Sequence, residues 1–193
     1  MNSELNPSAS PDKSGLTIYQ ISATALMTAL FCVLGPMSIP VGPVPISLTN
    51  FVFYLTVYLL GTKSGVISYL VYLLLGTAGL PVFSGYSGGL AKLAGPTGGY
   101  LVGFIFMGII SGIVIKKSHG KPLFSIPGMA AGTVVAYLFG TVWYCIEASC
   151  TFRAALYVCV FPFLPGDTVK ILLAAHTGPL IRRALQRAHL LEN

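Results

Sequence analysis

A carboxylate and an ammonium group stand three residues apart where an apolar run begins near the end of the chain. They are Asp167 and Lys170, in the stretch PFLPGDTVKILLAAH. Pro165 and Gly166 precede them, so we expect a helix with Asp167 in its first turn, where the helix dipole favours a negative charge. The i, i+3 spacing places Lys170 on the same face, one turn deeper. The pair would present a strong hydrogen-bond acceptor beside a strong donor.

Two interpretations of this pair are open. A charge at the centre of a membrane helix costs about 2.5–3.5 kcal/mol on insertion scales, so such residues need a reason to be there. The pair is either a structural ion pair with a capping role, or a polar clamp at the floor of an outward-facing pocket. The other four acidic residues, Glu4, Asp12, Glu147 and Glu192, fall in expected tails or loops. Asp167 is therefore the leading site candidate.

A glycine-rich stretch, GLPVFSGYSGGLAKLAGPTGGYLVGF (79–104), is the second candidate. Glycines permit unusual backbone angles and let backbone N–H groups face a ligand. Tyr86 and Tyr100 would add flat apolar surface with a polar tip. The alternative is a tight loop packed on helix ends. The run GTKSG at 61–65 lacks the spacing of a phosphate-binding loop, so we predict no nucleotide hydrolysis by this chain.

A proteolytic function is the alternative from a different class. GYSG (85–88) together with His176 in the last apolar run is similar to intramembrane serine proteases of the rhomboid type, with Ser87 as nucleophile. In that family the histidine is followed by x-x-Gly, whereas Gly178 here follows His176 by two positions. His176 would also lie about 13 Å deeper than Asp167 along a helix. A buried or helix-end histidine is the favoured interpretation.

Neither metal nor cofactor chemistry is predicted. The four cysteines, Cys32, Cys145, Cys150 and Cys159, follow no metal-ligand spacing and are expected to be free thiols.

In the first apolar run, ATALMTALF contains Ala25 and Ala29, a small-xxx-small pair that lets helices approach closely. This face serves either internal packing or docking of another membrane protein.

The composition indicates that these candidate residues belong to a polytopic membrane protein. Hydrophobic residues make up 54% of the chain and charged residues 8%, with a mean hydropathy of +0.81; ordinary soluble domains carry about 25% charged residues. Residues 1–16 are polar and lack the features of a signal peptide, so we expect a flexible cytoplasmic tail followed by a single membrane domain, 17–193. The net charge of +6 indicates cytoplasmic loops facing anionic lipid rather than a nucleic-acid partner.

Six apolar runs predict an all-α integral membrane protein with six transmembrane helices. The runs are 18–34, 47–60, 65–80, 99–115, 126–146 and 167–184. A shorter run, 154–164, contains Pro162 and is predicted to be interfacial.

The basic residues predict the orientation. One side would collect Lys13, Lys63, Lys116, Lys117, Lys121, Arg182, Arg183 and Arg187, and the other only Lys92 and Arg153. Both termini should therefore be cytoplasmic. The outer connections 35–46, 81–98 and 147–166 are long and rich in proline and glycine, so we expect them to cap a ligand pocket.

Five stretches resemble one family. They are GPVPISLTNF (42–51), LLLGTAGLPVFSGYSGGL (73–90), GPTGGYLVGF (95–104), YLFGTVW (137–143) and FLPGDTVK (163–170). Together they resemble BioY, the biotin-binding S component of energy-coupling-factor vitamin transporters. The resemblance covers nearly the whole chain. It implies six helices, cytoplasmic termini, an outward vitamin pocket in a prokaryotic cell membrane and no enzyme activity. It also implies an EcfT-type membrane subunit and two ABC-type ATPases as partners.

The resemblance also implies site residues. The family's PGD-x-x-K matches Asp167 and Lys170 as biotin contacts, and Ser87 occupies the small-residue position before a glycine pair. Thr49, followed by Asn50, stands where the family usually has glutamine, so the chain departs from the pattern there.

Two further features follow from the same resemblance. Lys92 falls where members are often uncharged and is a candidate local contact. Ala25 and Ala29 resemble the family's surface for EcfT.

Biotin fits this chemistry. Its ureido ring offers N–H donors and a carbonyl acceptor, which a carboxylate and an ammonium group can pair with. Its own carboxylate needs a donor, for which Lys92, Tyr100 or loop N–H groups are candidates. Another vitamin or a lipoate-like ligand on the same scaffold is the closest alternative.

Overall fold

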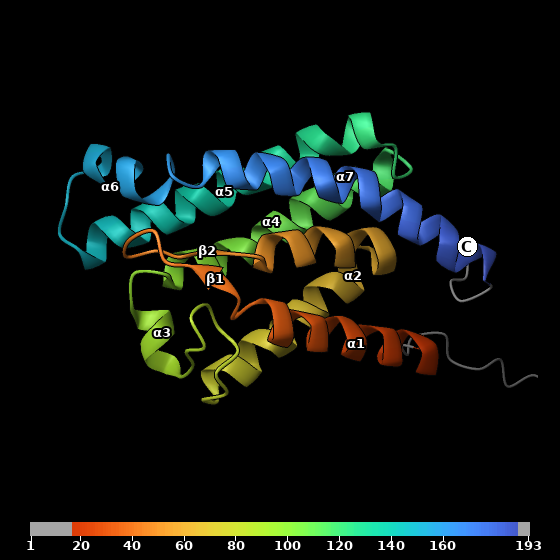
Figure 1. Ribbon diagram of the computed structural model, residues 1–193, viewed down its shortest axis with the longest axis horizontal. Coiled ribbons are helices and arrows are strands. Elements are labelled where there is room, and N and C mark those ends of the chain that lie inside the picture. Colours follow the sequence, from red (N-terminus) through yellow and green to blue (C-terminus); the bar gives the residue numbers. More distant parts are fainter. Residues whose placement is uncertain (1–16, 189–193) are drawn as a thin grey trace, which may run out of the picture.

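The computed structural model describes residues 17–188, which form a predominantly helical fold with one two-stranded antiparallel sheet (Figure 1). The predicted tail, 1–16, lies outside the described residues. The elements are α1 (Ile18–Leu34), β1 (Ser38–Ile39), β2 (Ile46–Ser47), α2 (Thr49–Thr77), α3 (Leu90–Ala94), α4 (Gly98–Lys117), α5 (Pro122–Glu147), α6 (Phe152–Cys159) and α7 (Leu164–Arg187).

The predicted apolar runs all fall largely within helices. Those at 18–34, 99–115, 126–146 and 167–184 lie within α1, α4, α5 and α7 respectively. The short run 154–164 forms most of α6 and the turn after it. The small sheet was not predicted. It pairs Ser38 with Ser47 and Ile39 with Ile46 in the connection expected to be a loop.

Helix α2 contains a break at Gly61, where φ is 79° and ψ is 176°. The predicted runs 47–60 and 65–80 lie on either side of it. A Cβ built on Gly65 would lie 3.0 Å from Cγ2 of Val57, although eight residues of straight helix span about 12 Å. The chain therefore doubles back at Gly61, and the two segments of α2 run in opposite directions (Figure 1).

Three helices, α2, α4 and α5, are long and apolar enough to cross a membrane, judged by length and composition. Helices α6 and α7 meet at a bend of 52° and would make a fourth span if taken as one broken crossing. Helix α1, with 17 residues, is shorter. The membrane-type helical fold is thus found, while the predicted count of six spans is not confirmed.

Helices α4 and α5 pack closely through glycines. A Cβ on Gly99 would lie 2.5 Å from the carbonyl oxygen of Phe139, and one on Gly132 would lie 2.8 Å from that of Met107. Small residues at such contacts let the two backbones approach. This packing holds α5 against α4 while α5 also contacts α7.

An aromatic core joins α1 to both segments of α2. Phe53 and Tyr69 stack with their ring centroids 4.8 Å apart, and Phe31 packs edge-on against both rings. The Tyr69 hydroxyl donates to the Leu101 carbonyl at 2.9 Å, which satisfies its polar group inside the core. Tyr72 stacks on Phe31 in this core and also lines a cavity, so the core supports one side of that cavity.

Candidate functional site

A cavity lies between the start of α7, the start of α2, the β1–β2 connection and the segment around α3. It has a volume of about 50 Å³, below the range of about 300–1,000 Å³ typical of small-molecule sites. The cavity is therefore narrow in this structure. Its lining consists of Val44, Pro45, Ser47, Thr49, Asn50, Tyr72, Phe83, Ser84, Lys92, Thr97, Tyr100, Leu101, Phe104, Phe163, Asp167 and Lys170.

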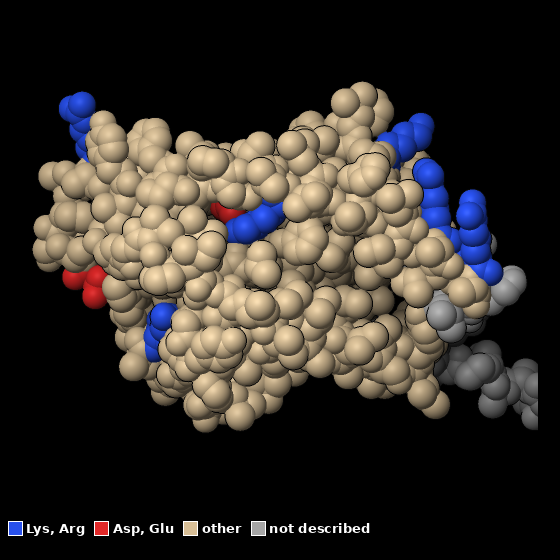
Figure 2. All heavy atoms as spheres, viewed as in Figure 1, with Lys and Arg blue, Asp and Glu red and all other residues tan. Residues whose placement is uncertain are grey.

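Asp167 and Lys170 form the polar centre of this cavity. Lys170 Nζ lies 3.0 Å from Asp167 Oδ1, and the residues are 9% and 6% exposed respectively. It is the only ion pair between residues of 17–188. Figure 2 shows an acidic and a basic side chain together in a hollow on the central part of this face. The first two turns of α7 therefore present both charges, as the i, i+3 spacing predicted.

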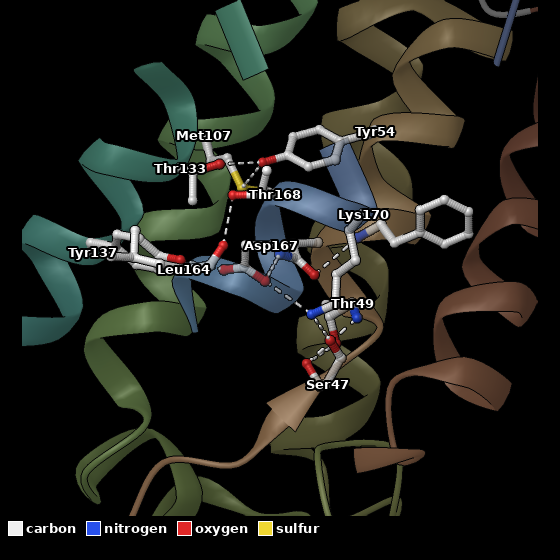
Figure 3. Close-up of polar contacts among 12 residues, drawn as sticks. Ser47, Thr49, Tyr54, Met107, Thr133, Tyr137, Leu164, Asp167, Thr168 and Lys170 are labelled. Atoms are coloured by element: carbon white, nitrogen blue, oxygen red, sulfur yellow. Dashed lines mark hydrogen bonds and ion pairs between the residues drawn. The ribbon is translucent and has the colours of Figure 1, made fainter. Parts of the chain in front are cut away.

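The Asp167 carboxylate accepts two more hydrogen bonds from other helices (Figure 3). Asn50 Nδ2 donates to Oδ1 at 2.8 Å, and the Tyr137 hydroxyl donates to Oδ2 at 2.6 Å. Charge-assisted bonds of this kind offset the cost of burying a carboxylate. Since a carboxylate has about four acceptor positions, three protein donors leave capacity for one more.

Lys170 ties α7 to the small sheet. Its Nζ donates to the Ser47 carbonyl at 2.6 Å as well as to Asp167. An ammonium group has three N–H donors, so one remains beyond these two bonds. The orientation of Asn50 is also determined, because its Oδ1 accepts from the Phe51 backbone N–H at 3.0 Å. By this count, one acceptor position on Asp167 Oδ2 and one N–H donor on Lys170 have no partner among the described residues.

Three further predicted residues line the same cavity. Thr49 is buried and its Oγ1 accepts from the Ser47 hydroxyl at 3.1 Å. Tyr100 donates its hydroxyl to the Cys159 carbonyl, and its ring leaves no space for a Cβ on Gly140. Lys92 lies in α3, where burial lowers the pKa of its ammonium group below the ordinary value. Apolar walls and a second cation therefore surround the polar centre.

Other predicted residues lie outside this lining. Tyr86 is 69% exposed, and the Ser87 hydroxyl donates to the Ser84 carbonyl at 2.9 Å; of these loop residues, Ser84 lines the cavity instead. His176 is exposed on α7, and no hydrogen bond joins it to Ser87 within 17–188. The arrangement required of a serine protease therefore has no support.

Ala25 and Ala29 lie on an exposed face of α1, available for contact with lipid or another subunit. The four cysteines are free, as predicted. Among the described residues, no cluster of three or more His, Cys, Asp or Glu side chains could hold a metal ion.

Two contributors to the polar centre were not predicted, the Tyr137 hydroxyl and the Ser47 carbonyl. Both lie in stretches that had been singled out, YLFGTVW and GPVPISLTNF. The available signal was chemical: a buried carboxylate needs several donors, and Tyr137 opens an otherwise apolar motif. A main-chain carbonyl such as that of Ser47 is common to all residues, so its role as an acceptor cannot be predicted from residue type.

The chain is similar to known proteins in both sequence and fold. A sequence model described as the BioY family matches residues 7–187. The "Probable biotin transporter BioY" of Pyrococcus horikoshii is 38% identical over 167 residues, covering 86% of this chain and 96% of the relative. The "Biotin transporter BioY" of Thermotoga maritima is 38% identical over 159 residues, covering 81% and 91% respectively.

A solved structure is also similar. The crystal structure of the S-component for biotin from an ECF-type ABC transporter superimposes with a TM-score of 0.80 at 29% identity. The match covers 88% of this chain and 95% of that one. With the family match spanning residues 7–187, the chain belongs to the BioY family.

Proposed function

We propose that this protein is the biotin-binding and translocating membrane subunit of an energy-coupling-factor transporter in a prokaryotic cell membrane. The observation that carries the proposal is the buried Asp167–Lys170 pair, which keeps one acceptor position and one donor unused inside a narrow cavity. The relatives named as biotin transporters support the choice of ligand.

The chemistry of the cavity fits a neutral polar ring with an apolar tail. A ureido N–H can donate to Asp167, and the ureido carbonyl can accept from Lys170. Val44, Phe104 and Phe163 line the cavity with apolar surface for the fused rings and tail. Lys92 supplies a positive charge for the carboxylate at the tail end. Tyr86 and Ser87 belong to the loop next to this cavity and are proposed to contact ligand only if that loop moves.

Energy is proposed to come from partner subunits. The sequence lacks a phosphate-binding loop, so we assign ATP hydrolysis to a pair of ABC-type ATPases acting through an EcfT-type membrane subunit. The exposed face at Ala25 and Ala29 is the proposed contact for that subunit, because small residues permit close helix approach.

We further propose that the chain crosses the membrane six times with both termini cytoplasmic. Counting the two antiparallel segments of α2 separately, together with α1, α4, α5 and α7, supports that number.

Titration of the purified protein with biotin tests the ligand. We expect a dissociation constant well below micromolar, since about 8 kcal/mol corresponds to micromolar binding. Excess unlabelled lipoate and other vitamins, added as competitors, distinguish biotin from a different ligand on this scaffold. Displacement by one of them at lower concentration than biotin would identify the true ligand, and absence of submicromolar biotin binding would refute the proposal.

A further inference from the structure

A second cavity lies at the opposite end of the helices from the Asp167 site. It has a volume of about 810 Å³ and is bounded by the turn of α2, the end of α4 and the last turns of α7. Arg182 in its wall follows Lys170 by about 18 Å along α7, at 1.5 Å per residue. The two cavities are therefore separate.

Positive charge dominates the wall of this second cavity. It is lined by Lys63, Lys116, Arg182 and Arg183, with His119 beside them, and no acidic residue of 17–188 lines it. Within 17–188, none of these cations forms an ion pair. Figure 2 shows basic side chains gathered at the end of the molecule where α7 ends. Cations that converge on one hollow without acidic partners leave their charge available to an external anion.

The backbone reinforces this charge. The second segment of α2 begins after the break at Gly61, and Thr62, Lys63 and Ser64 line the cavity. The first turn of a helix carries partial positive charge and N–H groups suited to an anion. Tyr58 also lines the cavity, and its hydroxyl is buried without a hydrogen-bond partner among the described residues.

Favourable interaction with helix dipoles explains the positions of only some of these basic residues. Lys116 lies in the last turn of α4, where a cation offsets the negative helix end. Lys63 instead lies at the start of a helical segment, where a cation is unfavourable, and Arg182 precedes the last turn of α7. The excess of lysine and arginine in cytoplasmic connections explains their side of the membrane, but it does not require four cations to line one cavity.

We propose that this basic cavity binds a phosphate group, carried by the headgroup of an anionic phospholipid or present as the free ion. Arginine binds phosphate through two parallel hydrogen bonds, and lysine adds a point charge. The site lies beside the helix ends, where a headgroup can reach it from the membrane surface. Bound there, the anion bridges the turn of α2 to α4 and α7 and stabilises the inner end of the helices.

Two matched triple variants test the site. The cavity variant combines Lys63→Gln, Lys116→Gln and Arg182→Gln. The control combines Lys117→Gln, Lys121→Gln and Arg187→Gln, which remove the same charge from the same end but do not line the cavity. Melting temperatures are measured in nanodiscs of phosphatidylcholine alone and of phosphatidylcholine with phosphatidylglycerol. Sodium phosphate is titrated into each protein in a neutral detergent, against sodium chloride of equal ionic strength.

We expect phosphatidylglycerol to raise the melting temperature of the wild type and of the control, and the cavity variant to lose most of that rise. Stabilisation by sodium phosphate in detergent would identify the free ion as sufficient; stabilisation by phosphatidylglycerol alone would identify the lipid. Equal losses in both triple variants would mean diffuse surface attraction and overturn the proposal, as would an undiminished rise in the cavity variant.

Biotin affinity in phosphatidylcholine serves as the folding check and should be unchanged in both triple variants. If the cavity variant does not fold, Arg182→Gln alone is compared with Arg187→Gln by the same measurements. Since biotin binding is measured separately, failure of this proposal is distinguishable from failure of the proposed function.

Discussion

At the scale of single residues, Asp167 is held by three donors from three directions, and this determines what its replacement should do. Oδ1 accepts from Asn50 and Lys170, while Oδ2 accepts from Tyr137. In Asp167→Asn, the amide oxygen can still accept from Asn50 and Lys170, and the NH₂ group can donate to the Tyr137 hydroxyl if that hydroxyl turns to accept. The buried Lys170 ammonium group then lacks a carboxylate partner, so the melting temperature should fall.

The same substitution should weaken biotin binding. Removing a hydrogen bond to a charged group costs about 1.5–3 kcal/mol, which is about ten- to a hundredfold in dissociation constant. Lys170→Met keeps the apolar stem and removes the donor, and we expect a similar loss. Calorimetric titration and thermal melting on the same preparations separate the effects. If both variants melt lower but bind biotin with unchanged affinity, the pair is only structural.

Tyr137 should act through Asp167. Tyr137→Phe removes the hydroxyl that donates to Oδ2 and leaves the ring in place. Oδ2 of Asp167 then loses this donor but can accept from another one, so the loss should be modest. We expect about three- to tenfold in biotin affinity, or about 1 kcal/mol. Tyr157→Phe, on the exposed face of α6, is the control and should bind as the wild type does. Equal affinities in the two variants would remove Tyr137 from the site.

Lys92 predicts a pH dependence of binding. Its ammonium group carries the charge only below its pKa, which burial lowers from the ordinary value of 10.5. If this charge pairs with the carboxylate of biotin, affinity should be full at neutral pH and decline as pH rises through that lowered pKa. Lys92→Arg should extend full affinity to higher pH, and Lys92→Gln should be weak but independent of pH. A wild-type profile that stays flat to about pH 10.5 would place the carboxylate elsewhere.

At the scale of elements, the reversal in α2 depends on one residue. Gly61 has φ 79° and ψ 176°, a region open essentially to glycine alone. Gly61→Ala should cost about 1–3 kcal/mol of stability, measured as a lower melting temperature in detergent. Gly166→Ala is the matched control, because its Cβ would meet only Ile46 Cγ2 at 3.9 Å. If the two variants melt alike, the break does not require glycine.

Helices and their approximate ends were predictable because apolar runs and their breakers are local features of the sequence. The i, i+3 spacing likewise predicted that Asp167 and Lys170 share a face. What could not be predicted was which distant groups meet that face. Tyr137 reaches Asp167 because α5 packs against α7 as well as against α4, and Ser47 reaches Lys170 because a short sheet forms in a proline-rich connection. Both depend on tertiary packing, and the second on a main-chain group.

At the scale of the whole molecule, the two ends of the helices differ in chemistry. One end holds the narrow cavity with its buried ion pair and flanking aromatic rings, and the other collects most of the basic side chains (Figure 2). Cytoplasmic connections of membrane proteins carry an excess of lysine and arginine. The Asp167 cavity would then open on the outer side, as uptake of a vitamin requires.

This asymmetry predicts the topology. A reporter fused after Asn193 should be cytoplasmic, whereas one inserted beside Ser149, in the exposed turn between α5 and α6, should be external. A third at His119, in the exposed turn between α4 and α5, is the internal control and should be cytoplasmic, because α5 alone separates it from Ser149. Exposed turns of this kind tolerate insertions. The crossing that these reporters test is the α6–α7 pair with its 52° bend. If Ser149 and Asn193 report the same side while His119 reports the other, that pair does not cross, and the six-span arrangement is wrong at its last step.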